Sequence, residues 1–280
     1  DFLETLDIDK TVEISSIQGG YSNAIKQLNK FIEVGYQDYA KYRSDPSKEA
    51  SSQLSPYFHS GQISTHEVFD KISELESWSP ESINPKMVGR REGWWGSTEN
   101  FESFMDELIT WRELGYHTCV RRANYNQYSS LPEWAIKTLH EHSSDEREHI
   151  YSLDELTYSQ THDEIWNAAQ NQLRTQGVIQ NYLRMLWGKK ILEWTPNPQI
   201  ALSYMITLND RYSLDGRDPN SYSGVFWILG RYDRAWGPER SIFGKIRYMT
   251  SDSTARKFNL KPYLEKWGNE SLGVSTSISK

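Results

Sequence analysis

The sequence has a single cysteine, Cys119, and no long apolar run. One cysteine excludes a scaffold held together by internal disulfides, and we interpret Cys119 as a small buried residue rather than a nucleophile. The longest apolar run, residues 225–229, is far shorter than the roughly 20 residues that span a bilayer. The first residues, DFLETLDIDK, are acidic and lack the basic and apolar parts of a secretion signal. We therefore expect an intracellular globular protein, in the cytoplasm or nucleus, with no membrane association.

The motifs of several common enzyme classes are absent as well. No GxGxxG follows a strand pattern, and the sequence contains no Walker loop, GxSxG elbow or HExxH pair. His140, His142 and His149 lie among acidic residues. Because neither a cysteine nor a helical i,i+4 histidine pair accompanies them, we interpret them as an exposed polar surface. The sequence thus predicts no metal site and shows no catalytic motif for ordinary hydrolytic chemistry.

Aromatic residues are abundant: the 280 residues include 11 Trp, 17 Tyr and 9 Phe. Chains that stay disordered are poor in aromatics. A chain of this length buries most of its unfolded surface, in one or two domains. Length and aromatic content together predict a globular protein with a large core.

The net charge is −7, which argues mildly against a general nucleic-acid binder. Residues 231–261 reverse this sign, because eight basic residues there are opposed by three acidic ones. A basic patch can bind phosphates while the rest of the surface repels them, although ordinary surface ion pairs are the alternative. The eight basic residues of this segment are Arg231, Arg234, Arg240, Lys245, Arg247, Arg256, Lys257 and Lys261.

Helical periodicity dominates the chain, while alternating strand patterns are scarce. The sequence Thr161-His-Asp-Glu164 has the form of a capping box, which predicts a helix start, and Gly177 predicts the end of that helix. We predict an all-α fold of a dozen or so helices. The clearest helical patterns cover residues 22–42, 100–116, 161–176, 178–194 and the stretch from Pro198 to before Asp215.

Turn-forming residues suggest how the chain is divided. Residues 77–97 hold several prolines and glycines and are expected to form a loop. Residues 1–20 look like a linker, residues 21–268 like a helical domain, and residues 269–280 like a flexible tail.

Three tryptophans fall on two of the expected helices. Trp187 and Trp194 are seven positions apart, so they lie roughly on one side of one helix. Arg184 shares a face with Trp187, and Trp166 lies on the preceding helix, which must pack nearby because the connection is short. Aromatic core packing explains this spacing. A path for electrons to a buried redox cofactor explains it too, because indole is easily oxidised.

Two other features leave similar alternatives open. Glu107 and Trp111 are four apart and share a helix face, either as a surface pair or as a carboxyl kept dry, with a raised pKa, that donates a hydrogen bond. The polar segment 208–220 follows an apolar helix. Its Asp215, Arg217 and Asp218 are either turn residues or groups that converge on a polar ligand.

Six sequence blocks, in order along the chain, give these features a common explanation. They resemble the FAD-binding catalytic domain of DNA photolyases and cryptochromes, and most closely the class II cyclobutane pyrimidine dimer photolyases. The resemblance runs through most of residues 20–267 and implies an all-α, photolyase-type helical domain with FAD as its cofactor. The blocks are ASSQLSPYFHSGQIS (50–64), DELITWRELGYHTC (106–119), THDEIWNAAQNQL (161–173), YLRMLWGKKILEWT (182–195), LNDRYSLDGRDPNSYSGVFW (208–227) and ERSIFGKIRYM (239–249).

By matching position, the resemblance assigns cofactor-binding roles. Arg184 and Asp215 match an ion pair beside the isoalloxazine ring, and Asn209 matches the asparagine that faces its redox-active nitrogen. The turn 51–55 matches a clamp whose hydroxyl and backbone N–H groups hold the pyrophosphate. The full set of expected FAD-binding residues is Tyr39, Ser51, Ser52, Gln53, Leu54, Ser55, Arg112, Arg184, Asn209, Asp215, Asp218 and Asn220.

The resemblance also implies catalytic and substrate-binding roles. Trp187, Trp166 and Trp194 match an electron-transfer chain, in that order outward from the flavin, and Asn209 counts among the catalytic residues. Glu107 matches the carboxyl that hydrogen-bonds the dimer, while Trp111 and Trp227 match two rings that cradle it. Within the basic segment, Arg240 and Arg256 are the expected contacts to DNA phosphates.

The implied activity is light-driven repair, in which reduced FAD gives an electron to a pyrimidine dimer flipped out of DNA. The alternative is a cryptochrome-like flavoprotein that repairs nothing and acts as a light or redox sensor or in another flavin-dependent role. Glu107, Trp111 and Trp227 favour repair, since a sensor needs no dimer pocket. The family's amino-terminal antenna domain has no counterpart in the sequence, so a separate antenna or partner protein is conceivable. Gln180 and Asn181 replace the His-Gly of class II members, and Ser60 replaces a phenylalanine.

Overall fold

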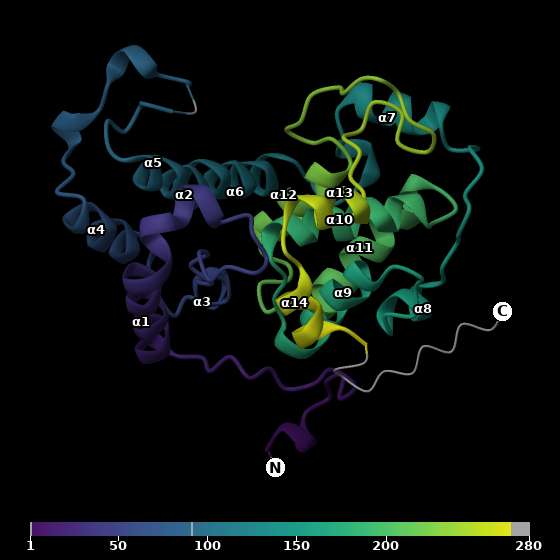
Figure 1. Ribbon diagram of the computed structural model, residues 1–280, viewed down its shortest axis with the longest axis horizontal. Helices are drawn as coiled ribbons and strands as arrows, with labels where there is room; N and C mark the ends of the chain where they lie inside the picture. Colours follow the sequence, from purple (N-terminus) through teal and green to yellow (C-terminus); the bar gives the residue numbers. More distant parts are fainter. Residues whose placement is uncertain (1, 91, 270–280) are drawn as a thin grey trace.

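The computed structural model describes residues 2–90 and 92–269 (Figure 1). Its elements are helices, and within the described residues the only β-type pairing is the isolated bridge between Arg240 and Gly244. The all-α prediction is confirmed. The α-helices are α1 Tyr21–Lys30, α2 Tyr39–Tyr42, α3 Ser55–His59, α4 Thr65–Leu75, α5 Glu99–Met105, α6 Arg112–Arg121, α7 Glu133–Glu141, α8 Leu153–Thr157, α9 Glu164–Gln176, α10 Asn181–Glu193, α11 Pro198–Tyr212, α12 Pro219–Ile228, α13 Ser251–Lys257 and α14 Lys261–Trp267.

Two apolar clusters form the interior. The first lies among α1 to α5 and includes Leu28, Phe31 and Phe104, all buried. The second and larger cluster lies among α7 to α14 and is centred on α9, α10 and α11. In Figure 1 the first group of helices occupies the purple and blue side and the second the green and yellow side.

Helix α12 is packed closely between α6 and α10, and glycine makes both approaches possible. A Cβ added at Gly115 of α6 would lie 2.9 Å from the Asn220 Oδ1 and the Ser223 Oγ of α12. A Cβ added at Gly188 of α10 would lie 2.1 Å from the Ile228 Cδ1 at the other end of α12. Helix α12 is thus held from two sides along most of its length.

Two of the predicted helical segments are interrupted. The predicted helix 22–42 consists of α1, a π-helical turn η2 (Phe31–Gly35), a 3-10 turn η3 (Tyr36–Asp38) and α2. A Cβ added at Gly35 would lie 2.6 Å from the Glu49 carbonyl oxygen, so a passing chain segment presses on the helix there. The predicted helix 100–116 is likewise split by the π-helical turn η6 (Asp106–Trp111), and α6 continues to Arg121.

The start of α9 differs from the predicted capping box. The side chain of Asp163 accepts a hydrogen bond from the Trp166 backbone N–H at 3.0 Å and caps the helix. The Thr161 hydroxyl instead donates to the Asn167 Oδ1 at 2.8 Å. The prediction of Thr161 as the cap is therefore wrong: its hydroxyl oxygen accepts from the Asp163 backbone N–H at 3.2 Å, before the helix begins, and the cap lies two residues later. The predicted end at Gly177 is confirmed, with φ 77°.

Residues 2–20 are mostly irregular, and they are attached to the larger cluster. The Ser15 hydroxyl donates to the Gln176 carbonyl at 2.7 Å, and Asp9 forms an ion pair with Arg211 at 2.8 Å. The loop 77–97 contains only the short turns η4 (Pro80–Ser82) and η5 (Pro85–Met87) among its described residues. The predicted tail lies outside the described residues from 270 onward.

Two further observations concern the described ranges as a whole. No helix in residues 2–90 or 92–269 has the length and apolarity needed to cross a membrane. In the same ranges, histidine, cysteine and carboxylate side chains do not gather in threes around a point that could hold a metal ion.

Lys189 is a fully buried lysine in the larger cluster. Its ammonium donates a hydrogen bond to the Ile228 carbonyl at 2.5 Å, at the end of α12. Burial, which penalises the charged form, lowers the pKa of Lys189 to about 7. No sequence pattern assigned a role to this lysine.

We expect the stability of the protein to rise between pH 7 and about pH 10 because of Lys189. In that range an unfolded chain binds a proton on this lysine, with a pKa near 10.4, that the folded chain does not bind. The free energy of unfolding should rise by up to about 1.4 kcal/mol per pH unit. Melting temperatures measured across this range should show the rise in the wild type and in the control Lys137→Met, whose side chain is 77% exposed. A slope that persists unchanged in Lys189→Met would contradict the assignment.

Candidate functional site

A cluster of polar side chains joins α10, α11 and the turn that follows α11. The Arg184 guanidinium donates to the Asn209 Oδ1 at 2.8 Å and lies 3.7 Å from the Asp215 carboxylate. The side chains of Arg184 and Asp215 are each 16% exposed. The Asn209 amide also donates to the Ser221 hydroxyl of α12. The structure therefore brings together Arg184, Asn209 and Asp215, as predicted.

Asp215 is held as a carboxylate in spite of its burial. Burial alone would raise its pKa, but the charge of Arg184 and hydrogen bonds from Ser213 and Ser55 outweigh this, so the pKa is lowered. The bond from Ser55 is informative because Ser55 ends the turn 51–55, which is distant in sequence. The cluster thus combines three separate segments, and the carboxylate fixes the orientation of the guanidinium.

The turn 51–55 and the start of α12 lie around this cluster. Gln53 has φ 54°, the left-handed conformation, which reverses the chain immediately before α3. The His59 Nδ1 lies 3.2 Å from the Asp218 carboxylate, and Asp218 caps α12 by accepting from the Asn220 backbone N–H at 2.9 Å. Asp218 and Asn220 therefore act as turn residues for their own backbone and also connect to the α3 region.

Two predicted cofactor residues lie in different surroundings. Tyr39 belongs to the first apolar cluster, where its ring packs edge-on against Phe104 with 5.2 Å between centroids. Arg112 forms an ion pair with Glu113 at 3.0 Å and lies over the Tyr116 ring at 4.4 Å, both on its own helix. For neither residue do these contacts include the cluster of Arg184, Asn209 and Asp215.

The three predicted chain tryptophans are buried and consecutive. The Trp166 indole N–H donates to the Trp187 carbonyl at 2.9 Å, and the Trp187 indole N–H donates to the Gln170 side chain at 2.8 Å. The Trp166 and Trp194 rings meet edge-on with 5.7 Å between centroids. Trp166 thus contacts the Trp187 backbone through its indole N–H and the Trp194 side chain through its ring, and Trp187 lies on the same helix as Arg184.

A second site lies where η6 and α6 meet α12. The rings of Trp111 and Trp227 are in contact, with 4.4 Å between centroids and 47° between planes. Tyr232 adds a third ring, 6.2 Å from Trp111. The Trp111 indole N–H donates to the Asp106 carboxylate at 3.0 Å. The structure therefore brings the two predicted dimer-cradling rings together in one half-buried patch.

Glu107 differs from the expected dry, neutral carboxyl. Its carboxylate forms an ion pair with the Arg43 guanidinium, and the two side chains are 36% and 20% exposed. The π-helical turn η6 contributes to this, because it pairs Trp111 with Asp106, five positions back. Of the two alternatives for Glu107, these contacts match the surface pair better than the carboxyl kept dry by its neighbours. Periodicity within one helix could not reveal Arg43.

The basic segment 231–261 is less open than its composition predicted. Arg231 is 5% exposed; it donates to the Tyr125 carbonyl at 2.8 Å and stacks on the Phe226 ring at 3.8 Å. Burial lowers the pKa of Arg231 to about 10. Arg231 is therefore a core residue and not a phosphate contact. Arg240 and Arg256 are both exposed.

Three residues that the sequence reading missed extend the tryptophan chain. The Tyr151 ring lies 5.4 Å from Trp194, and its hydroxyl is 2.7 Å from the His162 Nδ1. His149 stacks on His162 with 4.0 Å between centroids. Tyr151 and His149 come from the irregular segment before α8, so no helical spacing could have connected them to Trp194.

Comparison with known proteins places this geometry in context. No family model matches the chain. A deoxyribodipyrimidine photo-lyase of Methanothermobacter thermautotrophicus is 41% identical over 255 residues, which are 91% of this chain and 52% of that protein. One from Potorous tridactylus is 38% identical over 93% of this chain and 46% of that protein. The chain belongs to the photolyase/cryptochrome family.

The photolyase/cryptochrome fold is supported independently by structural comparison. A bacterial class III photolyase from Agrobacterium tumefaciens has a TM-score of 0.64 and 18% identity over 90% of this chain and 45% of that chain. The chain spans about half the length of the photolyases it matches. Three features of this photolyase/cryptochrome fold bear on its function. They are the Arg184 cluster, the tryptophan chain and the Trp111–Trp227 patch.

Proposed function

We propose that this chain carries the FAD-dependent, light-driven repair of cyclobutane pyrimidine dimers in DNA, as the class II resemblance implies. The observation that carries the proposal is the presence of both a buried Arg184–Asp215–Asn209 cluster and a half-buried Trp111–Trp227 patch, with Glu107 in the same π-helical turn as Trp111. A light or redox sensor would use the first site but has no need of the second. The matches that cover most of the chain are also to photolyases.

The donor set of the Arg184 cluster fits a flavin nucleotide. A guanidinium fixed by Asp215 supplies a positive charge beside a ring that becomes anionic on reduction, and Asn209 offers an amide to a ring nitrogen. The turn 51–55, bound to Asp215 through Ser55, would hold the pyrophosphate. FAD bound here would supply the light-driven transfer of one electron to the dimer.

The Trp111–Trp227 patch fits a flipped-out dimer. Extrusion from the duplex costs a few kcal/mol and is easiest at a damaged, poorly stacked site. Stacking on two indole rings returns roughly 1–3 kcal/mol per base. A hydrogen bond to the dimer where negative charge develops needs protonated Glu107 as the donor, so Glu107 would exchange its ion pair with Arg43 for a proton when the dimer binds.

Photorepair in solution is the direct test. The protein, loaded with FAD and reduced, should remove cyclobutane dimers from an irradiated thymine oligonucleotide under blue light, as measured by chromatography of the strands. The same mixture in the dark and a mixture without FAD serve as controls. Flavin uptake with no loss of dimers over many equivalents of absorbed light would contradict the proposal.

The salt dependence of DNA binding tests the expected phosphate contacts. Each phosphate contact contributes about 0.9 to the slope of log K against log salt on duplex DNA. We expect Arg240→Gln combined with Arg256→Gln to reduce the slope by about 1.8, measured by fluorescence anisotropy. Lys137→Gln, on the exposed side of α7, is the control. An unchanged slope in the double variant would place the phosphate contacts elsewhere.

A further inference from the structure

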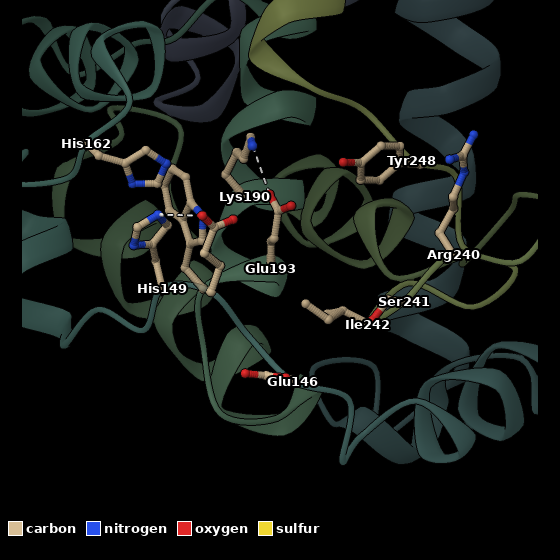
Figure 2. Close-up of a pocket in the computed structure, with 11 residues that line it drawn as sticks. Glu146, His149, His162, Lys190, Glu193, Arg240, Ser241, Ile242 and Tyr248 are labelled. Atoms are coloured by element: carbon tan, nitrogen blue, oxygen red, sulfur yellow. Dashed lines mark ion pairs between the residues drawn. The ribbon is translucent and has the colours of Figure 1, made fainter.

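The Arg184 cluster is separate from the cavity shown in Figure 2. That cavity, of about 440 Å³, lies beside Trp194, and none of the predicted flavin-binding residues lines it. Its lysine, Lys190, is already paired with Glu193 at 2.8 Å (Figure 2). The polar contacts that point to a further role lie instead around Asn209 of the Arg184 cluster, which is only 3% exposed.

The side-chain amide of Asn209 has a fixed orientation, because its neighbours differ in what they donate and accept. The Arg184 guanidinium has only N–H donors, so the atom 2.8 Å from it is the Asn209 oxygen. The amide nitrogen then donates to the Ser221 hydroxyl and lies 3.4 Å from the Asp210 Oδ1. An amide turned by half a rotation would set N–H against the guanidinium and oxygen against the carboxylate.

The two acceptors of the amide nitrogen are themselves held in place. Asp210 accepts from the Arg217 backbone N–H at 3.1 Å and from the Tyr222 hydroxyl at 3.2 Å. Ser221 is 7% exposed and belongs to α12, which is packed closely against α6 and α10. Both N–H groups of the Asn209 amide are therefore used within the protein. What the amide can still offer a ligand is the second lone pair of its oxygen.

We infer that Ser221 is a positioning residue that locks the Asn209 amide and thereby makes the site selective for reduced over oxidised FAD. The inference rests on the flavin binding in the proposed function, in which Asn209 faces a ring nitrogen. In reduced flavin that nitrogen carries a hydrogen and can donate it to the Asn209 oxygen. In oxidised flavin the same nitrogen has only a lone pair, and because the locked amide offers no donor, a buried acceptor stays unpaired.

Ser221→Ala tests the lock, because it leaves one N–H of Asn209 without a protein acceptor and free to pair with the oxidised ring. Pairing one buried acceptor should make the binding of oxidised FAD about tenfold tighter, while the binding of reduced FAD stays unchanged. Fluorescence titration of flavin-free protein, in air for oxidised FAD and without oxygen for reduced FAD, measures both affinities. A tenfold change in their ratio lowers the two-electron midpoint potential of bound FAD by about 30 mV, which equilibration with a reference dye measures separately.

Two variants of α12 make the result specific. Ser221→Thr keeps the hydroxyl and should keep the wild-type affinities and potential. Ser223→Ala removes a hydroxyl that donates to the Pro219 carbonyl of its own helix at 3.2 Å, and it should change neither quantity.

The outcomes separate this inference from the proposed function. An affinity ratio and a potential that are the same in Ser221→Ala and the wild type would overturn the inference, even if dimers are repaired. The expected shifts without any splitting of dimers would support the inference and contradict the repair function. A wild-type protein that takes up neither form of FAD would refute both.

Discussion

Replacing Glu107 with alanine should slow splitting of the dimer by about a hundredfold while FAD binding and flavin photoreduction stay intact. The loss of one preorganised hydrogen bond to a developing charge typically costs ~3 kcal/mol. Glu107 pairs with Arg43, whereas Arg184 pairs with Asp215, so removing the Glu107 carboxylate breaks no contact within the Arg184 cluster. Transient absorption of the repair reaction measures the splitting rate directly.

Two further variants make this result specific. Glu133→Ala removes an exposed carboxylate from the first turn of α7 and should repair like the wild type. Glu107→Gln keeps a hydrogen-bonding group and should lose less than Glu107→Ala. Wild-type repair by Glu107→Ala would show that the Trp111–Trp227 patch is not the dimer site.

Replacing Trp187 with phenylalanine should nearly abolish photoreduction of oxidised flavin. Phenylalanine preserves most of the packing but is far harder to oxidise, and Trp187 is the chain member on the same helix as Arg184. Steady-state illumination with the flavin spectrum as the readout measures the effect. Trp166→Phe and Trp194→Phe should shorten the lifetime of the separated charges. Each removes a member of the tryptophan chain beyond Trp187, so the positive charge stays closer to the flavin and recombines sooner.

Stability provides the control for this variant. Trp187→Phe leaves the buried Gln170 side-chain oxygen without its indole donor, which should cost about 1–3 kcal/mol in the free energy of unfolding. Trp78→Phe removes a comparable indole hydrogen bond, to the Trp95 carbonyl at 2.7 Å, but in the first apolar cluster. Trp78→Phe should therefore lose stability and keep photoreduction. Equal photoreduction in Trp187→Phe and the wild type would refute the chain.

Local sequence signals predicted the helices well and their interruptions poorly. Gly177 ended α9 as expected because the left-handed conformation is a property of one residue. No local pattern predicted the π-helical turns η2 and η6. At η2 the helix is in close contact, at Gly35, with the chain segment around Glu49, and such a contact cannot be read from periodicity. The cap of α9 was likewise misplaced. The Thr161 hydroxyl donates to Asn167, and Asp163, the residue just before the helix, is the cap.

In the candidate site, too, some features were predicted from the sequence, and contacts between distant residues were not. The pairing of Arg184 with Asp215 followed from matched positions in a known family, and the structure brings them together. The Arg43–Glu107 ion pair and the burial of Arg231 depend on contacts 64 and 106 residues apart in the chain. The contacts of Tyr151 and His162 with Trp194 were not predicted. Both residues lie in irregular segments, which have no periodicity that would indicate a neighbouring side chain.

The close packing of α12 against Gly115 and Gly188 fixes the position of this helix along its own axis. Its capping residue, Asp218, belongs to the proposed flavin side, and Trp227, nine residues later, belongs to the proposed dimer side. At about 1.5 Å per residue this fixes roughly 13 Å between the two ends, and neither end can drift while both glycine contacts hold. The distance between the Asp218 and Trp227 backbones is then a property of helix geometry, which side-chain changes at either end would leave unaltered.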